Sequence, residues 1–178
     1  EELPDSTGWG RLGDGSITEF DLVVGADGYA SIGRRTLFPD VNVVYAGYVL
    51  WRGSWPEQEL DEWEPLDMGV RCLGYPGGHG IFYFVPGPDG SVERGERLVN
   101  WGLYVPIAES ELAEFLTDEQ GHQFEGSLPP GAMPFATERT LKDNASRRVP
   151  TYYVDIIEKS TQPCASSISD CQVTAYRK

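Results

Sequence analysis

The stretch that decides the fold is GIFYFV at residues 80–85, followed after one turn by RLVNWGLYV at residues 97–105. Both runs are rich in aromatic and β-branched side chains, which favour strands. Turn residues stand beside them at Gly77-Gly78 and Pro88-Asp89-Gly90. Connections this short predict antiparallel pairing, because a parallel crossover needs about a dozen residues or more.

Other elements are expected on both sides of this pair. Hydrophobic runs predict strands at 43–53, 68–75 and 165–176, and a buried strand at Phe20–Gly25 that ends in glycine. Short helices are expected at 31–37, 57–63, 109–116, 132–148 and 150–159. The fold class that follows is α+β, a central and mostly antiparallel sheet with flanking helices.

Length and charge exclude several classes of partner. The 178 residues are 40% hydrophobic and 12% aromatic, which suits a chain with its own core. The formal net charge of −14 argues against nucleic acid and anionic membranes, since both attract basic surfaces. No apolar run approaches the roughly 20 residues that span a bilayer. Glu1 and Glu2 stand where a basic n-region would be, so we expect no secretory signal there.

Cysteine and histidine usage also bears on location and metal binding. Cys72, Cys164 and Cys171 form no CxxC pair, and reduced thiols in a cytoplasmic protein are the simpler interpretation. His79 and His122 are far apart in the sequence, which disfavours a histidine-rich metal site. We therefore expect a cytoplasmic protein with no metal.

Two glycine-rich stretches are candidates for binding a dinucleotide. Residues 8–13 match GxGxxG, but that motif needs a strand before it and a helix after it. Here Asp14-Gly15 suits a hairpin turn instead, so we interpret 8–13 as a glycine-rich loop.

The second candidate is Asp27-Gly28, which follows the apolar run Phe20–Gly25. Ligands bind at such strand ends in α/β sheets. Ser31 and Arg34 add donors for a phosphate one turn apart. On spacing alone, a strand, a tight turn and a helix cap remain the simpler interpretation.

The pattern of residues around this corner adds information that spacing lacks. Residues 21–34 resemble the Asp-Gly motif of FAD-dependent aromatic hydroxylases, the para-hydroxybenzoate hydroxylase-like flavoproteins. The sequence YAGYVLWRG at 45–53 resembles the strand that opens the middle domain of that family. Residues 83–91, 97–101 and 127–131 are similar to a branch that contains dihydroxypyridine hydroxylases.

The resemblance implies a division of the chain. Residues 1–40 would be a remnant of the FAD-binding domain, 41–165 the substrate-binding antiparallel-sheet domain, and 166–178 a strand returning toward the FAD domain. Such flavoproteins also carry a strand–GxGxxG–helix unit and a later Gly-Asp motif, and neither is in this sequence. The chain therefore resembles a fragment, and we expect it to be inactive when isolated.

The resemblance also implies a chemistry with FAD and NAD(P)H as cofactors. NAD(P)H reduces the flavin, oxygen forms a flavin hydroperoxide, and a small aromatic or heteroaromatic phenol attacks it. The implied partners are this substrate and, as a candidate assembly, a second copy of the chain. The implied cofactor-binding residues are Asp27, Gly28, Ser31 and Arg34.

The middle-domain sheet would form a roof over the flavin and line the substrate pocket. His79, Tyr83 and Trp101 are the candidate substrate-binding residues, because a polar-tipped aromatic wall suits a heteroaromatic phenol. Strand alternation alone does not show which face of the sheet meets the flavin. No residue is assigned a catalytic role.

Two other functions remain open. A non-catalytic antiparallel-sheet module would bind a small ligand on its aromatic face. An acidic hydrolase would use two carboxylates roughly 5–9 Å apart across a cleft. The dense acidic run at 57–64 offers carboxylates, although such a run is more typical of a solvated helix face.

Overall fold

The structure is a computed structural model that describes residues 9–171. Its contacts divide the chain into two units, Glu1–Val44 with Ser169–Lys178, and Tyr45–Ile168. The functional roles expected for 1–40, 41–165 and 166–178 remain predictions. None of the helices within the described range is long and apolar enough to cross a membrane.

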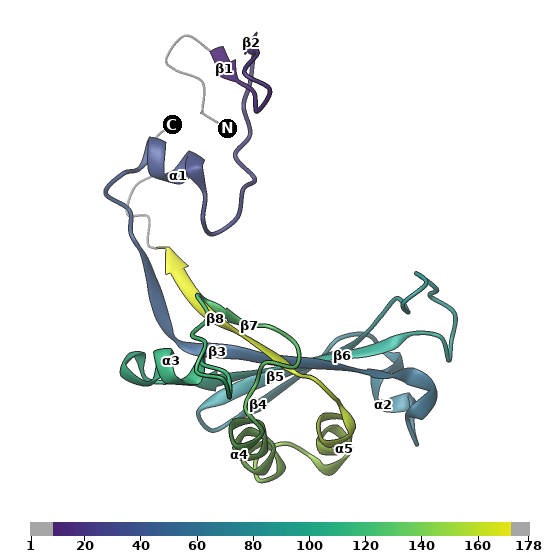
Figure 1. The fold of residues 1–178 in the computed structure, drawn as a ribbon. Helices are drawn as coiled ribbons and strands as arrows, with labels where there is room; N and C mark the ends of the chain where they lie inside the picture. The colour runs from purple at the N-terminus through teal and green to yellow at the C-terminus, as the bar shows by residue number, and fades with distance from the viewer. Residues whose placement is uncertain (1–8, 172–178) are drawn as a thin grey trace. The chain divides into compact units, whose positions relative to one another are not determined.

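A six-stranded sheet dominates the described part of the second unit (Figure 1). Its strand order is β4-β5-β6-β3-β8-β7. The pairs β4–β5, β5–β6, β3–β6 and β7–β8 are all antiparallel. The mostly antiparallel sheet expected from the short turns is therefore confirmed. The strands are β3 (Val43–Pro56), β4 (Arg71–Tyr75), β5 (Gly78–Val85), β6 (Leu98–Pro106), β7 (Ser127–Leu128) and β8 (Cys164–Cys171).

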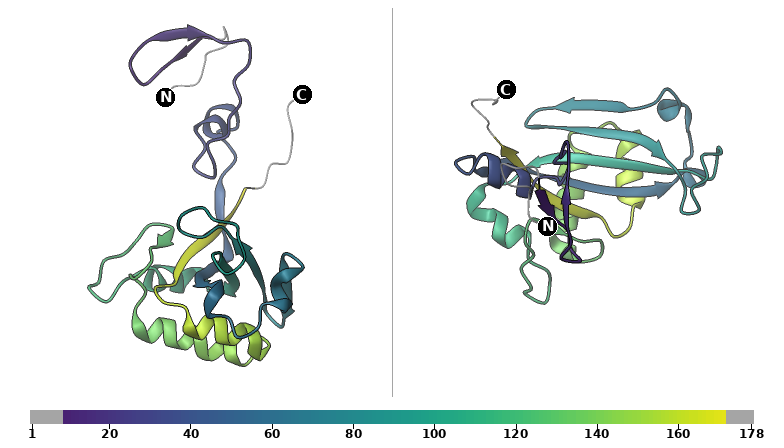
Figure 2. Two further views of the ribbon diagram at one scale, coloured as in Figure 1. Left: turned by 90° about the vertical axis from the view of Figure 1, so that its right-hand side faces the viewer. Right: turned by 90° about the horizontal axis from the view of Figure 1, so that it is seen from above.

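Short helices flank this sheet, as expected. α4 and α5 lie side by side against one face of the sheet (Figures 1 and 2). Each begins directly after a proline, Pro134 or Pro150, whose fixed φ suits a helix start. The helical elements of this unit are η1 (Glu57–Glu59), α2 (Glu64–Asp67), α3 (Glu109–Phe115), α4 (Phe135–Ser146) and α5 (Thr151–Lys159).

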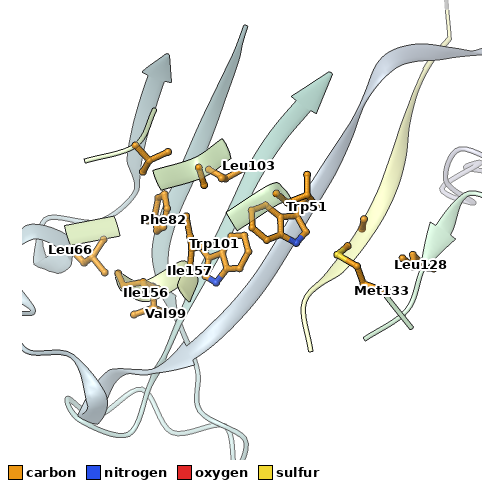
Figure 3. Packing of buried hydrophobic residues seen from close by; sticks show 14 of the residues in the cluster. Trp51, Leu66, Phe82, Val99, Trp101, Leu103, Leu128, Met133, Ile156 and Ile157 are labelled. Carbon is orange, nitrogen blue, oxygen red and sulfur yellow. The ribbon is translucent and has the colours of Figure 1, made fainter. Parts of the chain in front are cut away.

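The hydrophobic core lies between the sheet and the pair α4 and α5 (Figure 3). Trp51 and Trp101 meet edge to face there, with 4.8 Å between ring centres. The Trp101 indole N–H donates to the buried Ser160 hydroxyl over 2.8 Å, which satisfies a polar group that burial would otherwise leave unpaired. The other buried members include Leu66, Phe82, Val99, Leu103, Leu141, Ile156 and Ile157.

Gly53 allows this packing, because the Trp101 ring lies against its backbone. A Cβ atom on Gly53 would lie 2.8 Å from Trp101 Cζ2, closer than van der Waals contact permits. The glycine of the Trp51-Arg52-Gly53 stretch therefore has a packing role on the helix-covered face.

A buried ion pair closes the connection between β5 and β6. Glu57 is 4% exposed, and its carboxylate accepts hydrogen bonds from Gly95 N over 2.8 Å and from Arg97 Nε over 2.9 Å. Arg97 Nη2 donates to the same carboxylate, and its guanidinium lies 4.0 Å above the Phe84 ring centre. These bonds, the one with Arg97 above all, lower the pKa of Glu57.

The described part of the first unit contains a hairpin and one helix. β1 (Trp9–Arg11) and β2 (Ile17–Glu19) pair antiparallel, and Gly15 adopts a φ of 85° in their turn. The expected turn at Asp14-Gly15 is confirmed, although Gly8 of the GxGxxG stretch lies outside the described residues. α1 (Ile32–Leu37) confirms the expected helix.

The buried strand expected at Phe20–Gly25 is wrong for this structure. These residues form no strand and are exposed, with Leu22 at 78% and Val24 at 75%. A strand is stabilised by a hydrogen-bonded neighbour, and no described strand pairs with this stretch. An apolar run alone therefore did not determine its conformation.

Element ends differ by a few residues from those expected. β4 begins at Arg71 rather than at residue 68, and the helix expected at 57–63 is the single 3₁₀ turn η1. α4 begins at Phe135 rather than at residue 132. Of the last strand, residues 172–176 lie outside the described part.

Candidate functional site

The face of the sheet opposite α4 and α5 carries polar and aromatic side chains, and we call it the open face. Strand pairing arranges its residues in three rows across β3, β6 and β5. The rows are Leu50–Tyr104–His79, Arg52–Gly102–Ile81 and Ser54–Asn100–Tyr83. These side chains are half-buried or exposed, apart from the buried Gly102.

His79 and Tyr104 form an aromatic stack at one end of the open face. Their rings lie 4.1 Å apart and nearly parallel, at 16°. Tyr48 meets Tyr104 at 5.8 Å and 65°. His79 is exposed, so its imidazole can reach a ligand while Tyr104 restricts its orientation.

Tyr83 lies in the row on the other side of Gly102, paired with Asn100. The tyrosine and the carboxamide are both half-buried. The structure therefore places His79 and Tyr83 on one face of β5, four residues apart and with Ile81 between them on that face.

Trp101 does not lie on this face. The prediction that it lines a pocket together with His79 and Tyr83 is therefore wrong. Trp101 points to the helix-covered face, is fully buried and bonds to Ser160. Alternation along β6 is the reason, since Asn100 and Trp101 are neighbours and must point to opposite faces.

Arg52 is a candidate site residue that the sequence reasoning did not select. It is exposed on the open face, where it helps to line a hollow of about 300 Å³ with Ser54, Asn100 and Gln162. The signal was present in the alternation of residues 45–53, which sets Arg52 opposite the buried Trp51.

The Asp27-Gly28 corner lies in the first unit and is exposed. The Asp27 carboxylate accepts hydrogen bonds from Ile32 N over 2.6 Å and Gly33 N over 3.3 Å. A hydrogen bond from Ser31, followed by these backbone bonds, lowers the pKa of Asp27 to about 2. The carboxylate therefore stays ionised and caps the first turn of α1.

Gly28, Ser31 and Arg34 complete this corner. Gly28 has a φ of 71°, a backbone conformation that favours glycine. The space where a Cβ atom would stand is open. The Ser31 hydroxyl accepts from Arg34 N over 2.9 Å. Arg34 Nε is buried and finds no hydrogen-bond partner among the described residues, so a donor remains to be satisfied here.

The acidic run at 57–64 does not form one cluster. Glu57 is bound to Arg97, whereas Glu59, Asp61 and Glu62 line a separate hollow beside α5. Lys159 lies 3.3 Å from Asp61 there. The two groups of carboxylates thus serve different parts of the fold.

Comparison with known proteins identifies relatives of both units. Residues 45–170 match the family described as FAD binding domain-like. The chain is 29% identical over 167 residues to 2,6-dihydroxypyridine 3-monooxygenase of Paenarthrobacter nicotinovorans, which covers 92% of this chain and 41% of that protein. It is 37% identical over 87 residues to 3-amino-4-hydroxybenzoate 2-monooxygenase of Streptomyces cremeus, covering 49% of this chain and 21% of that protein.

A solved structure agrees with this result. The 2,6-dihydroxypyridine-3-hydroxylase from Arthrobacter nicotinovorans superposes with a TM-score of 0.74 at 26% identity, over 97% of this chain and 44% of that chain. This chain spans less than half the length of these relatives. Because the family match covers well over half of its residues, the chain belongs to the FAD binding domain-like family, as the resemblance to FAD-dependent aromatic hydroxylases predicted.

Proposed function

We propose that the protein carrying this chain is an FAD-dependent, NAD(P)H-using monooxygenase that hydroxylates a small aromatic or heteroaromatic phenol. The observation that carries the proposal is the family match over the sheet unit, residues 45–170. Relatives named as monooxygenases of a hydroxypyridine and of a hydroxybenzoate support the substrate class. A cytoplasmic location is part of the proposal, and three cysteines without a disulfide are consistent with it.

The cofactor would be held in part by the Asp27-Gly28 corner. The residues there suit a polar ligand, because Asp27 is exposed, the space beside Gly28 is open, and Arg34 Nε lacks a partner among the described residues. A carboxylate suits ribose hydroxyls, and a guanidinium suits phosphate. When bound, FAD supplies hydride acceptance from NAD(P)H and oxygen transfer.

The substrate would lie on the open face of the sheet. His79 and Tyr83 would orient its hydroxyl by hydrogen bonding, and an imidazole in that place can also take its proton. The half-buried Leu50 and Ile81 would exclude water from the ring.

The test uses the full-length protein with FAD, NADH or NADPH, and 2,6-dihydroxypyridine as the first of a panel of phenols. We expect yellow protein, ring-dependent consumption of NAD(P)H and a product heavier by one oxygen atom. Stoichiometric binding of the phenols to flavin-loaded protein, without turnover of any of them, would favour the non-catalytic binding module instead.

A further inference from the structure

We propose that the hollow beside Arg52 binds the ionised group of an anionic aromatic ligand, a ring that carries a carboxylate or a ring oxyanion. The aromatic part of this inference rests on the proposed function. The preference for a negative charge rests on the open face itself.

The charge distribution is the first argument. The chain has 28 acidic and 14 basic residues, yet none of the nine positions in the three rows of the open face is acidic. Arg52 is the one permanent cation among these nine. Three rows without carboxylates, on a chain of net charge −14, lower the electrostatic cost of bringing an anion close to them.

The state of Arg52 is the second argument. No described residue forms a hydrogen bond or ion pair with its guanidinium, whereas Arg97 is paired with Glu57 and Arg94 with Asp67. A guanidinium presents a planar fork of donors that matches a carboxylate. With no partner among the described residues, the guanidinium of Arg52 can bind the carboxylate of a ligand on the open face.

The lining of the hollow is the third argument. Around Arg52 it offers neutral hydrogen-bonding groups and no carboxylate, within a volume of about 300 Å³. Carboxamide, hydroxyl and thiol groups can all donate to the oxygens of an anion. They belong to Ser54, Asn100, Thr161, Gln162 and Cys164.

Gly102 lies next to this anion site, beneath the side chain of Leu50. It lies directly between Arg52 and Ile81 in the middle row, and it has no side chain to separate them. A Cβ there would lie 2.8 Å from Leu50 Cδ1 and 3.8 Å from Arg52 Cβ. The space above Gly102 is therefore filled by Leu50, and the ring of the ligand would pack against the Leu50 side chain with its ionised group toward Arg52.

The experiment compares two ligands that differ in charge but hardly in shape, 4-hydroxybenzoate and 4-hydroxybenzamide. Each is titrated into the flavin-loaded, full-length protein without NAD(P)H, at a pH near 7. We expect the wild type to bind the benzoate more tightly. Arg52→Ala should weaken benzoate binding roughly 10- to 100-fold and benzamide binding about 2-fold or less. Arg52→Lys should recover part of the loss.

Arg147→Ala is the matched control. Arg147 is exposed at the end of α4, and its substitution by alanine removes the same charge as Arg52→Ala. It should leave both affinities unchanged. The inference is overturned by a wild type without preference for the benzoate, or by equal losses for both ligands in Arg52→Ala. It is also overturned if Arg52→Ala lowers FAD content and spares the preference, since Arg52 would then serve the cofactor. Because the experiment measures affinity and not turnover, it tests the role of Arg52 even if the protein does not hydroxylate phenols.

Discussion

At the scale of single residues, Gly53 and Gly74 offer a matched pair of strand glycines. A Cβ on Gly53 meets Trp101 Cζ2 at 2.8 Å, while one on Gly74 meets nothing within 4 Å. We expect Gly53→Ala to lower the free energy of unfolding by about 1–3 kcal/mol through overpacking. Gly74→Ala should change it by less than about 0.5 kcal/mol. Urea unfolding of both variants checks this, and equal effects would contradict the assigned contact.

Asp27 permits a second prediction at this scale. In the full-length protein, Asp27→Ala should reduce FAD retention, measured from flavin absorbance per chain, more than it lowers the melting temperature. Asp14→Ala is the control, because Asp14 also bonds within its own turn, to Ser16 N over 2.9 Å, but lies in the hairpin. Unchanged FAD affinity with a lower melting temperature would make Asp27 a structural turn residue only.

At the scale of elements, the connection from β5 to β6 depends on Glu57. Glu57→Gln would leave Arg97 without its carboxylate, and we expect a loss of roughly 3 kcal/mol in the free energy of unfolding at pH 7. Glu59→Gln, two residues along and exposed, should cost little. Chemical unfolding of the two variants beside the wild type measures the difference.

The same carboxylate predicts a pH dependence. The pKa of Glu57 is lowered in the folded state from its ordinary value of 4.5. Its ionisation therefore stabilises the fold fully above that value, and the contribution is lost as pH falls through the lowered pKa. The stability gap between the wild type and Glu57→Gln should shrink on acidification below about pH 4.5. A gap that stays constant down to pH 2 would rule out this linkage.

At the scale of the whole molecule, the proposed function assigns stability to the helix-covered face of the sheet and ligand binding to the open face. Trp101→Phe removes the bond to Ser160 and leaves a cavity, so it should lower the free energy of unfolding by about 2–3 kcal/mol. Its affinity for a phenol should stay near the wild-type value. Tyr83→Phe should weaken that affinity and leave stability within about 0.5 kcal/mol. Phenol titration and urea unfolding of each variant test this. If Trp101→Phe lowered the affinity and Tyr83→Phe lowered the stability, the roles assigned to the two faces would be wrong.

The sequence determined the elements whose signals are local. Apolar runs and short glycine turns predicted the strands β3, β4, β5 and β6 and the antiparallel pairing of β4, β5 and β6, and prolines predicted the starts of α4 and α5 to within a few residues. The pattern around Asp27-Gly28 and Trp51-Arg52-Gly53 was specific enough to indicate the family. Each of these signals depends on residues close together in the chain.

Tertiary structure decided what depends on distant partners. Phe20–Gly25 has the composition of a buried strand, but without a paired strand in the described structure it is exposed coil. Alternation showed that Asn100 and Trp101 point to opposite faces, but only the packing of α4 and α5 showed which face is covered. For the same reason Trp101 proved to be a core residue and Arg52 a surface one, because burial of a side chain depends on elements remote in sequence.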